Sequence, residues 1–243
     1  MNTLNDISVE PVNNLSKDVA KEALKKLRKE LFELQNKFYA DGRFALLIIL
    51  QGMDTSGKDG TIRHVFSSMN PQGVQVKSFK KPTEEELSHD FLWRVYSHVP
   101  PKGVIQIFNR SYYEDIIMPI IENKSSDKMM IHRCKLIKNL EEHFEQNNIT
   151  VIKMFLHISK EEQEKRIKER LTKPHKRWKF SKEDTNVAKL WHKYQTAYNS
   201  IINNCDSPDW NIIPANKKWY RNYQVAKILT EHLKNLNLKY PNN

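Results

Sequence analysis

The stretch LLIILQGMDTSGKDGTIRHVF, from Leu46 to Phe66, changes from an apolar run to a helical pattern at a cluster of glycines. The chain has 243 residues and six glycines, and three of these, Gly52, Gly57 and Gly60, fall within nine residues of this stretch. The letters GMDTSGK fit the pattern Gly-x4-Gly-Lys between a buried strand and a helix, which is typical of a phosphate-binding loop. Glycines let such a loop turn its backbone N–H groups inward around a phosphate. The stretch therefore predicts a strand, a phosphate-binding loop and a helix, in this order.

We expect the side chain of Lys58 to add a full positive charge to the phosphate that the loop binds. In most such loops the next residue is a Ser or Thr whose hydroxyl holds magnesium, but here it is Asp59. The metal must then find another ligand, and Asp54 inside the loop is the candidate. The alternative is that the glycines only form a tight strand-to-helix turn. The predicted phosphate-binding residues are Gly52, Met53, Thr55, Ser56, Gly57, Lys58, Asp59 and Gly60.

Beyond this stretch, short apolar runs alternate with longer helical patterns. The apolar runs are continuous rather than alternating, as expected of strands buried on both faces, and they cover residues 44–51, 74–79, 103–108, 151–158 and 210–215. Helical patterns cover residues 21–39, 83–96, 127–146 and 159–171. Capping-box spacing is found at Thr83 with Glu86 and at Ser159 with Glu162. The alternation predicts an α/β fold, with about five parallel strands between two layers of helices.

A second polar motif, FNRSYYED, follows the strand predicted at residues 103–108. Because ligands bind at the carboxyl ends of parallel strands, we expect Arg110 and Glu114 to project toward the phosphate-binding loop. A guanidinium group matches phosphate oxygens with two parallel hydrogen bonds, which favours a phosphate contact for Arg110. Ser111 and Glu114 also have capping-box spacing, so Glu114 is interpreted either as a site residue or as a helix cap.

A third feature is the run EKRIKERLTKPHKRWKFSKED, which contains nine Lys or Arg residues between positions 165 and 182. A helix that ends at Pro174, a basic turn and a further helix capped by Ser181 are typical of a hinged lid. Arg166 and Arg170 are four residues apart, so they share one helical face and could reach one ligand together. The alternative is a solvated charged face. The candidate polyanion contacts in this lid are Arg166, Lys176, Arg177 and Lys179.

The composition of the whole chain limits the possible partners, location and number of domains. The formal net charge of +11 favours a polyanionic partner, and a solubilising surface is the alternative. No apolar run is long enough to cross a bilayer, and residues 1–14 lack the pattern of a secretory signal. Cys134 and Cys205 are far apart and have no metal-ligand spacing, which suits a reducing compartment. We therefore expect one cytoplasmic domain over residues 1–243, with an N-terminal helical extension at 1–40 and a lid at about 160–200.

Four segments together give the sequence a specific resemblance. GMDTSGKDGTIRHVF, SFKKPTEEELSHDFLWR, IQIFNRSYYED and ANKKWYRN, in this order, resemble the polyphosphate kinase 2 family, whose members transfer phosphoryl groups between inorganic polyphosphate and nucleotides. The resemblance covers residues 38–223 and implies a three-layer αβα P-loop kinase fold with a mobile helical lid. It further implies that Asp54 binds Mg²⁺ or Mn²⁺, that Lys58 and Arg110 contact the transferring phosphate, and that Arg170 closes over it.

The resemblance also concerns the nucleotide that accepts the phosphate. Family members that favour nucleoside diphosphates resemble FDRSWYN, whereas this chain has Asn109 in place of the aspartate and Glu114 in place of the asparagine. Similarity to the FNRSxYED subgroup implies that both mono- and diphosphates are accepted. We expect the carboxylate of Glu114 to help hold a metal ion.

Two other functions remain possible from the sequence. One is an ATP-dependent nucleoside monophosphate kinase of the thymidylate kinase type, against which Asp59 argues. The other is a basic nucleic-acid-binding protein, but no recognised nucleic-acid motif is present, and the tryptophans Trp178, Trp191, Trp210 and Trp219 are more typical of a core. We therefore expect polyphosphate and nucleotides as partners, no membrane, no specific nucleic acid, and a homo-oligomer as an option.

Overall fold

A five-stranded parallel sheet forms the centre of the protein. The structure is a computed structural model, and it describes residues 3–12, 15–180 and 182–241. The strands are β1 (Ala45–Gln51), β2 (Val74–Ser78), β3 (Ile105–Asn109), β4 (Ile149–His157) and β5 (Trp210–Pro214). They lie in the order β2-β3-β1-β4-β5, and every neighbouring pair is parallel. The predicted α/β class and the five parallel strands are confirmed.

Strand β1 is the middle strand, and all seven of its residues are buried because helices cover both faces of the sheet. Its register with β3 pairs Leu50 with Asn109, so the two strands end side by side. The backbone N–H of Arg110 donates to the carbonyl of Leu50 at 3.0 Å. The glycine-rich loop after β1 and the polar motif after β3 therefore start from neighbouring points at one edge of the sheet.

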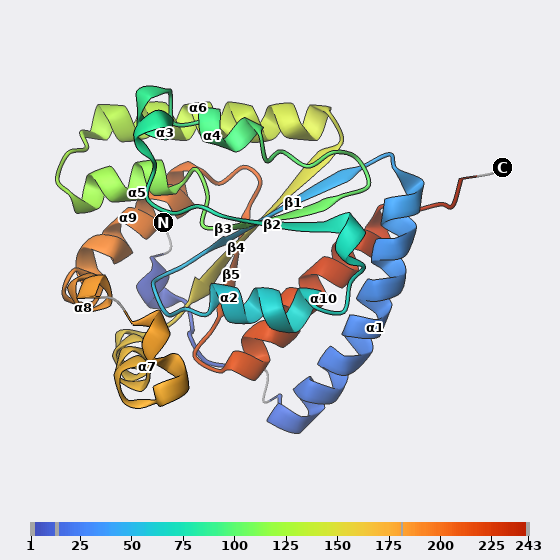
Figure 1. Cartoon of the computed structure of the whole chain (residues 1–243), viewed down its shortest axis with the longest axis horizontal. Coiled ribbons are helices and arrows are strands. Elements are labelled where there is room, and N and C mark those ends of the chain that lie inside the picture. The colour runs from blue at the N-terminus through green and yellow to red at the C-terminus, as the bar shows by residue number, and fades with distance from the viewer. Residues whose placement is uncertain (1–2, 13–14, 181, 242–243) are drawn as a thin grey trace.

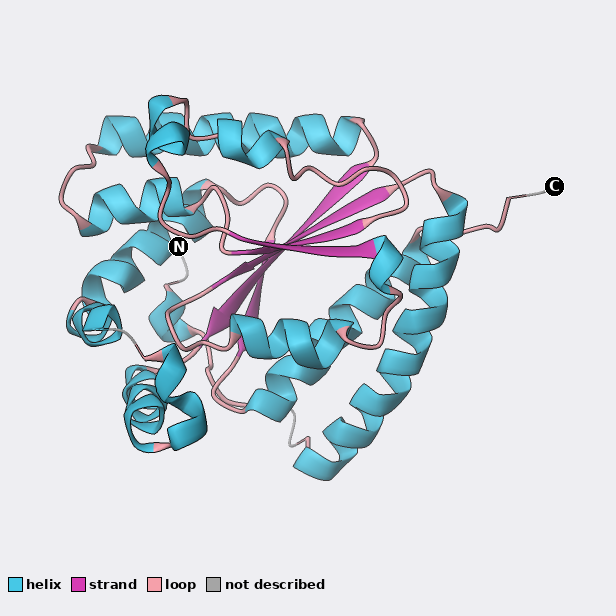
Figure 2. Ribbon diagram, viewed as in Figure 1, coloured by secondary structure: helices cyan, strands magenta, loops and turns pink. Residues whose placement is uncertain are grey.

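Helices flank the sheet on both faces (Figure 1). One layer holds α1 (Lys17–Asp41), α2 (Lys58–Thr61), which continues as a π-helical turn, η2 (Ile62–Phe66), and α10 (Lys218–Asn235). The other layer holds α5 (Glu114–Ile121), α6 (Asp127–Gln146) and α9 (Trp191–Asn204), and Figure 2 shows helices on both sides of the twisted strands. Residues 1–40, expected as an extension, include a helix that packs along α10 with Leu31 and Phe38 buried.

The stretch predicted as one helix at 83–96 forms two short helices. These are α3 (Glu84–Ser88) and α4 (Trp93–Tyr96), which are separated by a turn in which the carboxylate of Asp90 accepts a hydrogen bond from the N–H of Leu92 at 2.9 Å. An Asp that bonds to the backbone two residues ahead favours a turn over a continuous helix. The prediction of a single helix was wrong for this reason.

The two predicted capping boxes have different outcomes. Thr83 and Glu86 form a complete box at the start of α3. The hydroxyl of Ser159 caps α7 (Lys160–Thr172) by accepting from the N–H of Glu162, but the carboxylate of Glu162 pairs with Arg166 at 2.8 Å instead of returning to the cap.

The predicted lid contains α7, a 3-10 helix, η4 (Pro174–Lys179), and α8 (Lys182–Lys189). Figure 1 shows α7 and α8 beyond the edge at which the strand arrows end. The last part of the predicted range, α9, lies in the helical layer with Trp191 and Tyr198 buried. The predicted cap residue Ser181 lies outside the described residues. The remaining 3-10 turns are η1 (Leu4–Asp6) and η3 (Pro71–Gly73).

Within the described part of the chain, no helix combines the length and the apolar character that crossing a membrane requires.

Candidate active site

The glycine-rich loop leaves β1 and enters α2 through backbone conformations that favour glycine. Gly52 has a φ of 144° and Gly57, the N-cap of α2, has a φ of 104°. A Cβ atom at Gly52 would lie 2.6 Å from the carbonyl oxygen of Leu156, and one at Gly57 would lie 1.8 Å from Nη1 of Arg221. The glycines therefore do more than make a turn, because they let the loop lie directly on β4 and on a buried arginine.

Side chains beneath the loop hold its carbonyl groups. Arg166 donates to the carbonyls of Thr55 and Ser56, each at 2.9 Å, and Arg221 donates to Ser56 at 3.1 Å. Gln163 donates to the carbonyl of Asp54 at 3.1 Å. Because a trans peptide directs its N–H away from its C=O, this arrangement turns amides of the loop toward the opposite side.

Lys58, the first residue of α2, is buried inside the loop. Its Nζ donates to the carbonyls of Gly52 at 2.7 Å and of Met53 at 3.3 Å. Burial lowers the pKa of Lys58 to about 8, and the positive charge of Arg110 adds to this lowering. The carboxylates of Asp54 and other nearby acids oppose it. Lys58 is therefore a desolvated cation whose charge an incoming phosphate can stabilise.

Arg110 and Asp54 form an ion pair at the junction of the loop and β3. Arg110 has a φ of 62°, and its side chain reaches the loop from the end of β3. Burial disfavours both charges, but nearby opposite charges outweigh it: Asp54 with Glu114 raises the pKa of Arg110, and Arg110 with Lys58 lowers that of Asp54. Both groups are therefore charged at neutral pH, and the structure brings together the two residues predicted from separate motifs.

Glu114 does not form the capping box that its spacing suggested. Tyr113 is the N-cap of α5 without a side-chain hydrogen bond, and the hydroxyl of Ser111 accepts instead from the N–H of Tyr113 and from Nε2 of Gln51, each at 3.2 Å. Burial raises the pKa of Glu114, although Arg110 opposes the rise. Among the described residues, its buried Oε1 atom has no hydrogen-bond partner.

The carboxylates of Asp54 and Glu114 fit a magnesium ion. Oxygen is the ligand that Mg²⁺ prefers, and Mg²⁺ is often held by one or two carboxylates with phosphate oxygens and water in the other positions. The described residues contain no group of three or more His, Cys, Asp or Glu side chains that could form a closed metal site. In the described part of the chain, Glu114 has a buried carboxylate oxygen without a hydrogen-bond partner and lies close enough to Asp54 for their charges to interact, but it is not part of the wall of the cleft at the glycine-rich loop.

A buried network fixes the segment between Arg110 and Glu114. The hydroxyls of Tyr112 and Tyr113 donate to the carboxylate of Glu141 on α6 at 2.7 and 2.8 Å. Lys153 on β4 pairs with the same carboxylate at 2.9 Å. Fully paired buried groups rigidify their surroundings, so this network positions the motif that supplies Arg110 and Glu114.

Asp59, predicted in the phosphate-binding loop, connects three elements. Its carboxylate accepts from Nδ2 of Asn109 at 2.8 Å and lies 3.6 Å from Nζ of Lys179 in η4. These contacts, together with Lys58, lower the pKa of Asp59 against the effect of burial. The residue that replaces the usual Ser or Thr therefore links the loop to the lid.

The predicted lid cations have different positions. Arg166 is buried, and besides the loop it donates to the carbonyls of Ala215 and Asn216 at 2.8 and 2.9 Å. With Glu162 on its Nε, all five of its N–H groups face protein oxygens, so the structure does not place Arg166 on an open lid surface. It supports the loop from below.

Arg170 lines the cleft above the loop. Burial raises the pKa of Asp54, whereas the charges of Arg110, Lys58 and, with a smaller effect, Arg170 lower it. Lys176, paired with Glu169 at 2.5 Å, and Lys179 also line the cleft. Arg177 donates to the carbonyl of Leu171 at 3.2 Å and is not among the residues of the cleft wall. Trp178, expected in a core, is instead 78% exposed.

The cleft enclosed by the loop, β3 and the lid has a volume of about 910 Å³. Among the side chains that the structure describes, its wall holds three carboxylates, those of Asp54, Asp59 and Glu169. Against them stand ten basic side chains: Lys58, Arg63, Lys80, Arg110, Arg166, Arg170, Lys176, Lys179, Lys218 and Arg221. Such an excess of positive charge in a concave site attracts a highly phosphorylated ligand.

Sequence reasoning assigned no role to Arg221, Tyr198 or Gln163. Arg221 lies in the quoted segment ANKKWYRN, and its burial lowers its pKa to about 9, with Arg166 adding to the effect. The hydroxyl of Tyr198 donates to the carbonyl of Gly52 at 3.1 Å from α9. Only the presence of Arg221 in a quoted motif could have drawn attention to any of the three, since their contacts span more than 100 residues of sequence.

Known proteins are similar to this chain over nearly its whole length. The family model described as polyphosphate kinase 2 matches residues 14–241. An AMP/ADP-polyphosphate phosphotransferase from Meiothermus ruber is 46% identical, over 93% of this chain and 85% of its own. An ADP-polyphosphate phosphotransferase from Rhodopseudomonas palustris is 40% identical, over 93% and 83%. The crystal structure of polyphosphate kinase 2 from Arthrobacter aurescens TC1 has a TM-score of 0.96 at 37% identity, and covers 99% of this chain and 88% of that one.

Proposed function

This chain belongs to the polyphosphate kinase 2 family, and on that basis we propose that it transfers the terminal phosphoryl group of inorganic polyphosphate to nucleoside mono- and diphosphates. The observation that carries the proposal is the cleft at the glycine-rich loop, whose described wall residues include ten basic side chains and three carboxylates. The printed activities of the relatives from Meiothermus ruber and Rhodopseudomonas palustris are of this kind. They do not favour the alternative, an ATP-dependent nucleoside monophosphate kinase.

The proposed reaction is a direct in-line transfer. Such a transfer needs alignment and charge neutralisation rather than covalent help from side chains. The loop amides and Lys58 hold the terminal phosphate of the donor, while Arg110 and Arg170 neutralise the charge that develops on the transferring group. Asp54 and Glu114 would hold Mg²⁺ or Mn²⁺, and the bound ion would supply positive charge against the phosphate groups.

One set of reactions tests this function. The purified protein is supplied with polyphosphate, a divalent metal and AMP, ADP, GMP or GDP in separate reactions without ATP, and the products are separated by chromatography. We expect ADP from AMP and ATP from ADP. A parallel reaction contains ATP and AMP without polyphosphate; ADP formed there, with no product from polyphosphate, would instead identify the monophosphate kinase.

We expect Glu114→Asn to lower kcat/KM for AMP by about tenfold and for ADP by about twofold. A monophosphate brings few oxygens to a shared metal ion, so it depends on the second carboxylate more than a diphosphate does. The measurement is kcat/KM for both acceptors with polyphosphate as the donor, together with thermal unfolding. Equal losses in a variant of unchanged stability would contradict a metal-positioning role for Glu114.

We also propose a cytoplasmic location, supported by two free, buried cysteines, Cys134 and Cys205, which suit a reducing compartment.

A further inference from the structure

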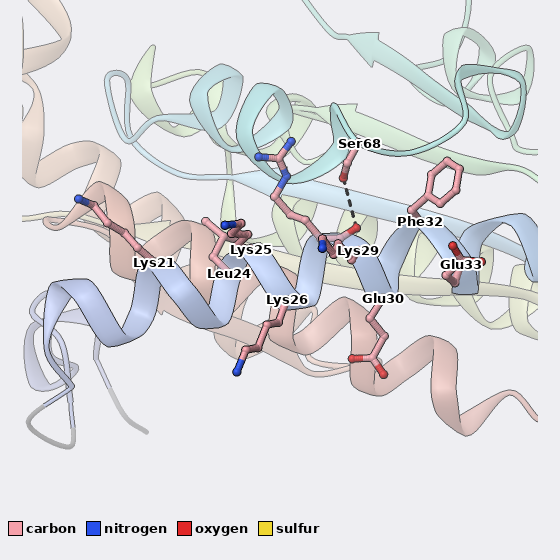
Figure 3. Close-up of a pocket in the computed structure, with 10 residues that line it drawn as sticks. Lys21, Leu24, Lys25, Lys26, Lys29, Glu30, Phe32, Glu33 and Ser68 are labelled. Atoms are coloured by element: carbon pink, nitrogen blue, oxygen red, sulfur yellow. Dashed lines mark hydrogen bonds between the residues drawn. The ribbon is translucent and has the colours of Figure 1, made fainter.

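A second groove, separate from the catalytic cleft, runs along the N-terminal half of α1 (Figure 3). Its volume is about 870 Å³, and it lies between α1 and the turn that follows η2. Ser68 of that turn donates a hydrogen bond to the backbone carbonyl of Arg28 at 3.5 Å. The groove wall consists of Lys21, Leu24, Lys25, Lys26, Arg28, Lys29, Glu30, Phe32, Glu33 and Ser68.

The wall of this groove is basic. Five of its ten residues carry a positive charge and two, Glu30 and Glu33, carry a negative one. Glu30 is paired with Lys234 of α10 at 2.6 Å, so part of the negative charge is already neutralised. Lys21, Lys25 and Lys29 are exposed and repeat every four residues, which places them on one side of the helix over about 12 Å. Flexible ammonium groups in such a row suit a linear polyanion better than a single compact phosphate group.

Positive charge continues from the catalytic cleft to this groove across the segment formed by α2 and η2. Arg63 and His64 of η2 line the catalytic cleft, as does Arg221. On the other side, Arg28 lines the groove and donates to the hydroxyl of Ser67, the residue that ends η2, at 3.1 Å. Burial lowers the pKa of His64, and the charges of Arg63, Arg221 and Arg28 lower it further. Charges of arginines from both sites therefore act on His64.

We propose that the groove along α1 binds the distal part of a long polyphosphate chain whose terminal phosphate lies in the catalytic cleft. This inference rests on the proposed function, because it assumes that polyphosphate is the substrate. Charge complementarity identifies the occupant: the two sites carry the same sign of charge, and Arg63 on one side of η2 and Arg28 on the other continue that charge between them. A polyanion anchored at two places gains affinity from the second site without any new contact at the first.

The test compares two triple variants that remove the same charge. In one, Lys21, Lys25 and Lys29 are replaced by glutamine. In the control, Lys102, Lys128 and Lys135, which are exposed and line neither site, are replaced by glutamine. Affinities for a fluorescently labelled polyphosphate of about a hundred phosphates and for a linear chain of a few phosphates are measured by anisotropy over a range of salt concentrations, without nucleotide.

We expect the groove variant to bind the long chain about tenfold more weakly, with a smaller dependence of affinity on salt, because fewer counterions are released. Its affinity for the short chain stays within about twofold of the parent protein, since a short chain fills the catalytic cleft alone. The control variant keeps both affinities within the same limit.

Three outcomes would overturn the inference. An equal loss of affinity for the long chain in both variants would indicate a general effect of net charge. An equal loss of affinity for long and short chains in the groove variant would show that the three lysines contribute to binding in the catalytic cleft. A change of oligomeric state in size-exclusion chromatography, with unchanged binding of the long chain, would assign the groove to a second copy of the protein. Binding is measured separately from turnover. A protein that binds polyphosphate but phosphorylates no nucleotide would refute the proposed function, and the binding data would still test the groove.

Discussion

The Lys58→Met variant is expected to lose turnover by at least about a hundredfold while remaining as stable as the parent protein at pH 7. Lys58 is buried within the loop, where its Nζ donates to the carbonyl of Gly52 at 2.7 Å, and we propose that it neutralises oxygens of the transferring phosphate. Methionine has a similar length and no charge. The expected loss is therefore a loss of charge stabilisation in the transition state, measured as kcat with polyphosphate and ADP.

The pKa of Lys58 gives this prediction a second signature. Burial lowers it from 10.5 to about 8, so the folded protein disfavours the charged lysine. The free-energy cost of that charge is complete below pH 8 and disappears as the pH rises from about 8 to about 10.5. At pH 7 the variant avoids the full cost of the buried charge, and we expect this gain to offset its lost hydrogen bonds. As the pH rises from about 8 to about 10.5 the parent protein loses that cost as well, so the stability of the variant relative to the parent should fall.

The control for this variant is Lys128→Met, which removes a lysine exposed on α6, far from the loop in sequence and outside the cleft. It should retain kcat within about twofold. A Lys58→Met protein that is folded and nearly fully active would remove the loop from the mechanism.

The Gly57→Ala variant is expected to lose both stability and activity. Its new Cβ atom would lie 1.8 Å from Nη1 of Arg221, at a φ of 104° that L-residues with a side chain rarely adopt. Arg221 cannot easily withdraw, because it donates to the carbonyl of Ser56 at 3.1 Å and to the side chain of Asn222 at 2.9 Å. We expect a stability loss of about 2–4 kcal/mol and at least about a hundredfold lower turnover, because the loop must move to relieve the clash.

Gly42→Ala is the matched control for this substitution. Gly42 ends α1 with a φ of 64°, and within the described parts of the chain a Cβ atom there would meet no heavy atom within 4 Å. The control should lose about 1 kcal/mol from backbone strain alone and keep its activity. Chemical denaturation and steady-state kinetics measure both variants. If the two variants lose the same stability and Gly57→Ala remains active, the contact between the loop and Arg221 does not determine the shape of the site.

The sequence alone was sufficient for the features that depend on local patterns. A continuous apolar run followed by Gly-x4-Gly-Lys predicted β1, the loop and the start of α2, because burial of a strand and the need for glycine are both readable over a few residues. The polar cluster after the strand predicted at residues 103–108 placed Arg110 near the loop that holds Asp54, since the carboxyl ends of parallel strands share one edge of a sheet. The structure confirms that these two residues meet.

Local patterns were insufficient where two interpretations shared one spacing. Ser111 and Glu114 have the spacing of a capping box, but Ser111 is already bonded to Tyr113 and Gln51, and Glu114 begins the helix instead. The basic run from Lys165 onward gave no means of separating Arg166, whose five N–H groups all donate to protein oxygens, from Arg170, although both line the cleft.

Tertiary structure alone decided what supports the loop. Arg221 reaches Ser56 across 165 residues and Arg166 reaches Thr55 across 111, and neither contact leaves a periodic trace in the sequence. The strand order β2-β3-β1-β4-β5 brings these segments to one edge, because each crossover must cover an apolar face of the sheet. A side chain's partner across such a distance is fixed by the packing of whole elements, whereas its own neighbours in sequence determine only the element in which it lies.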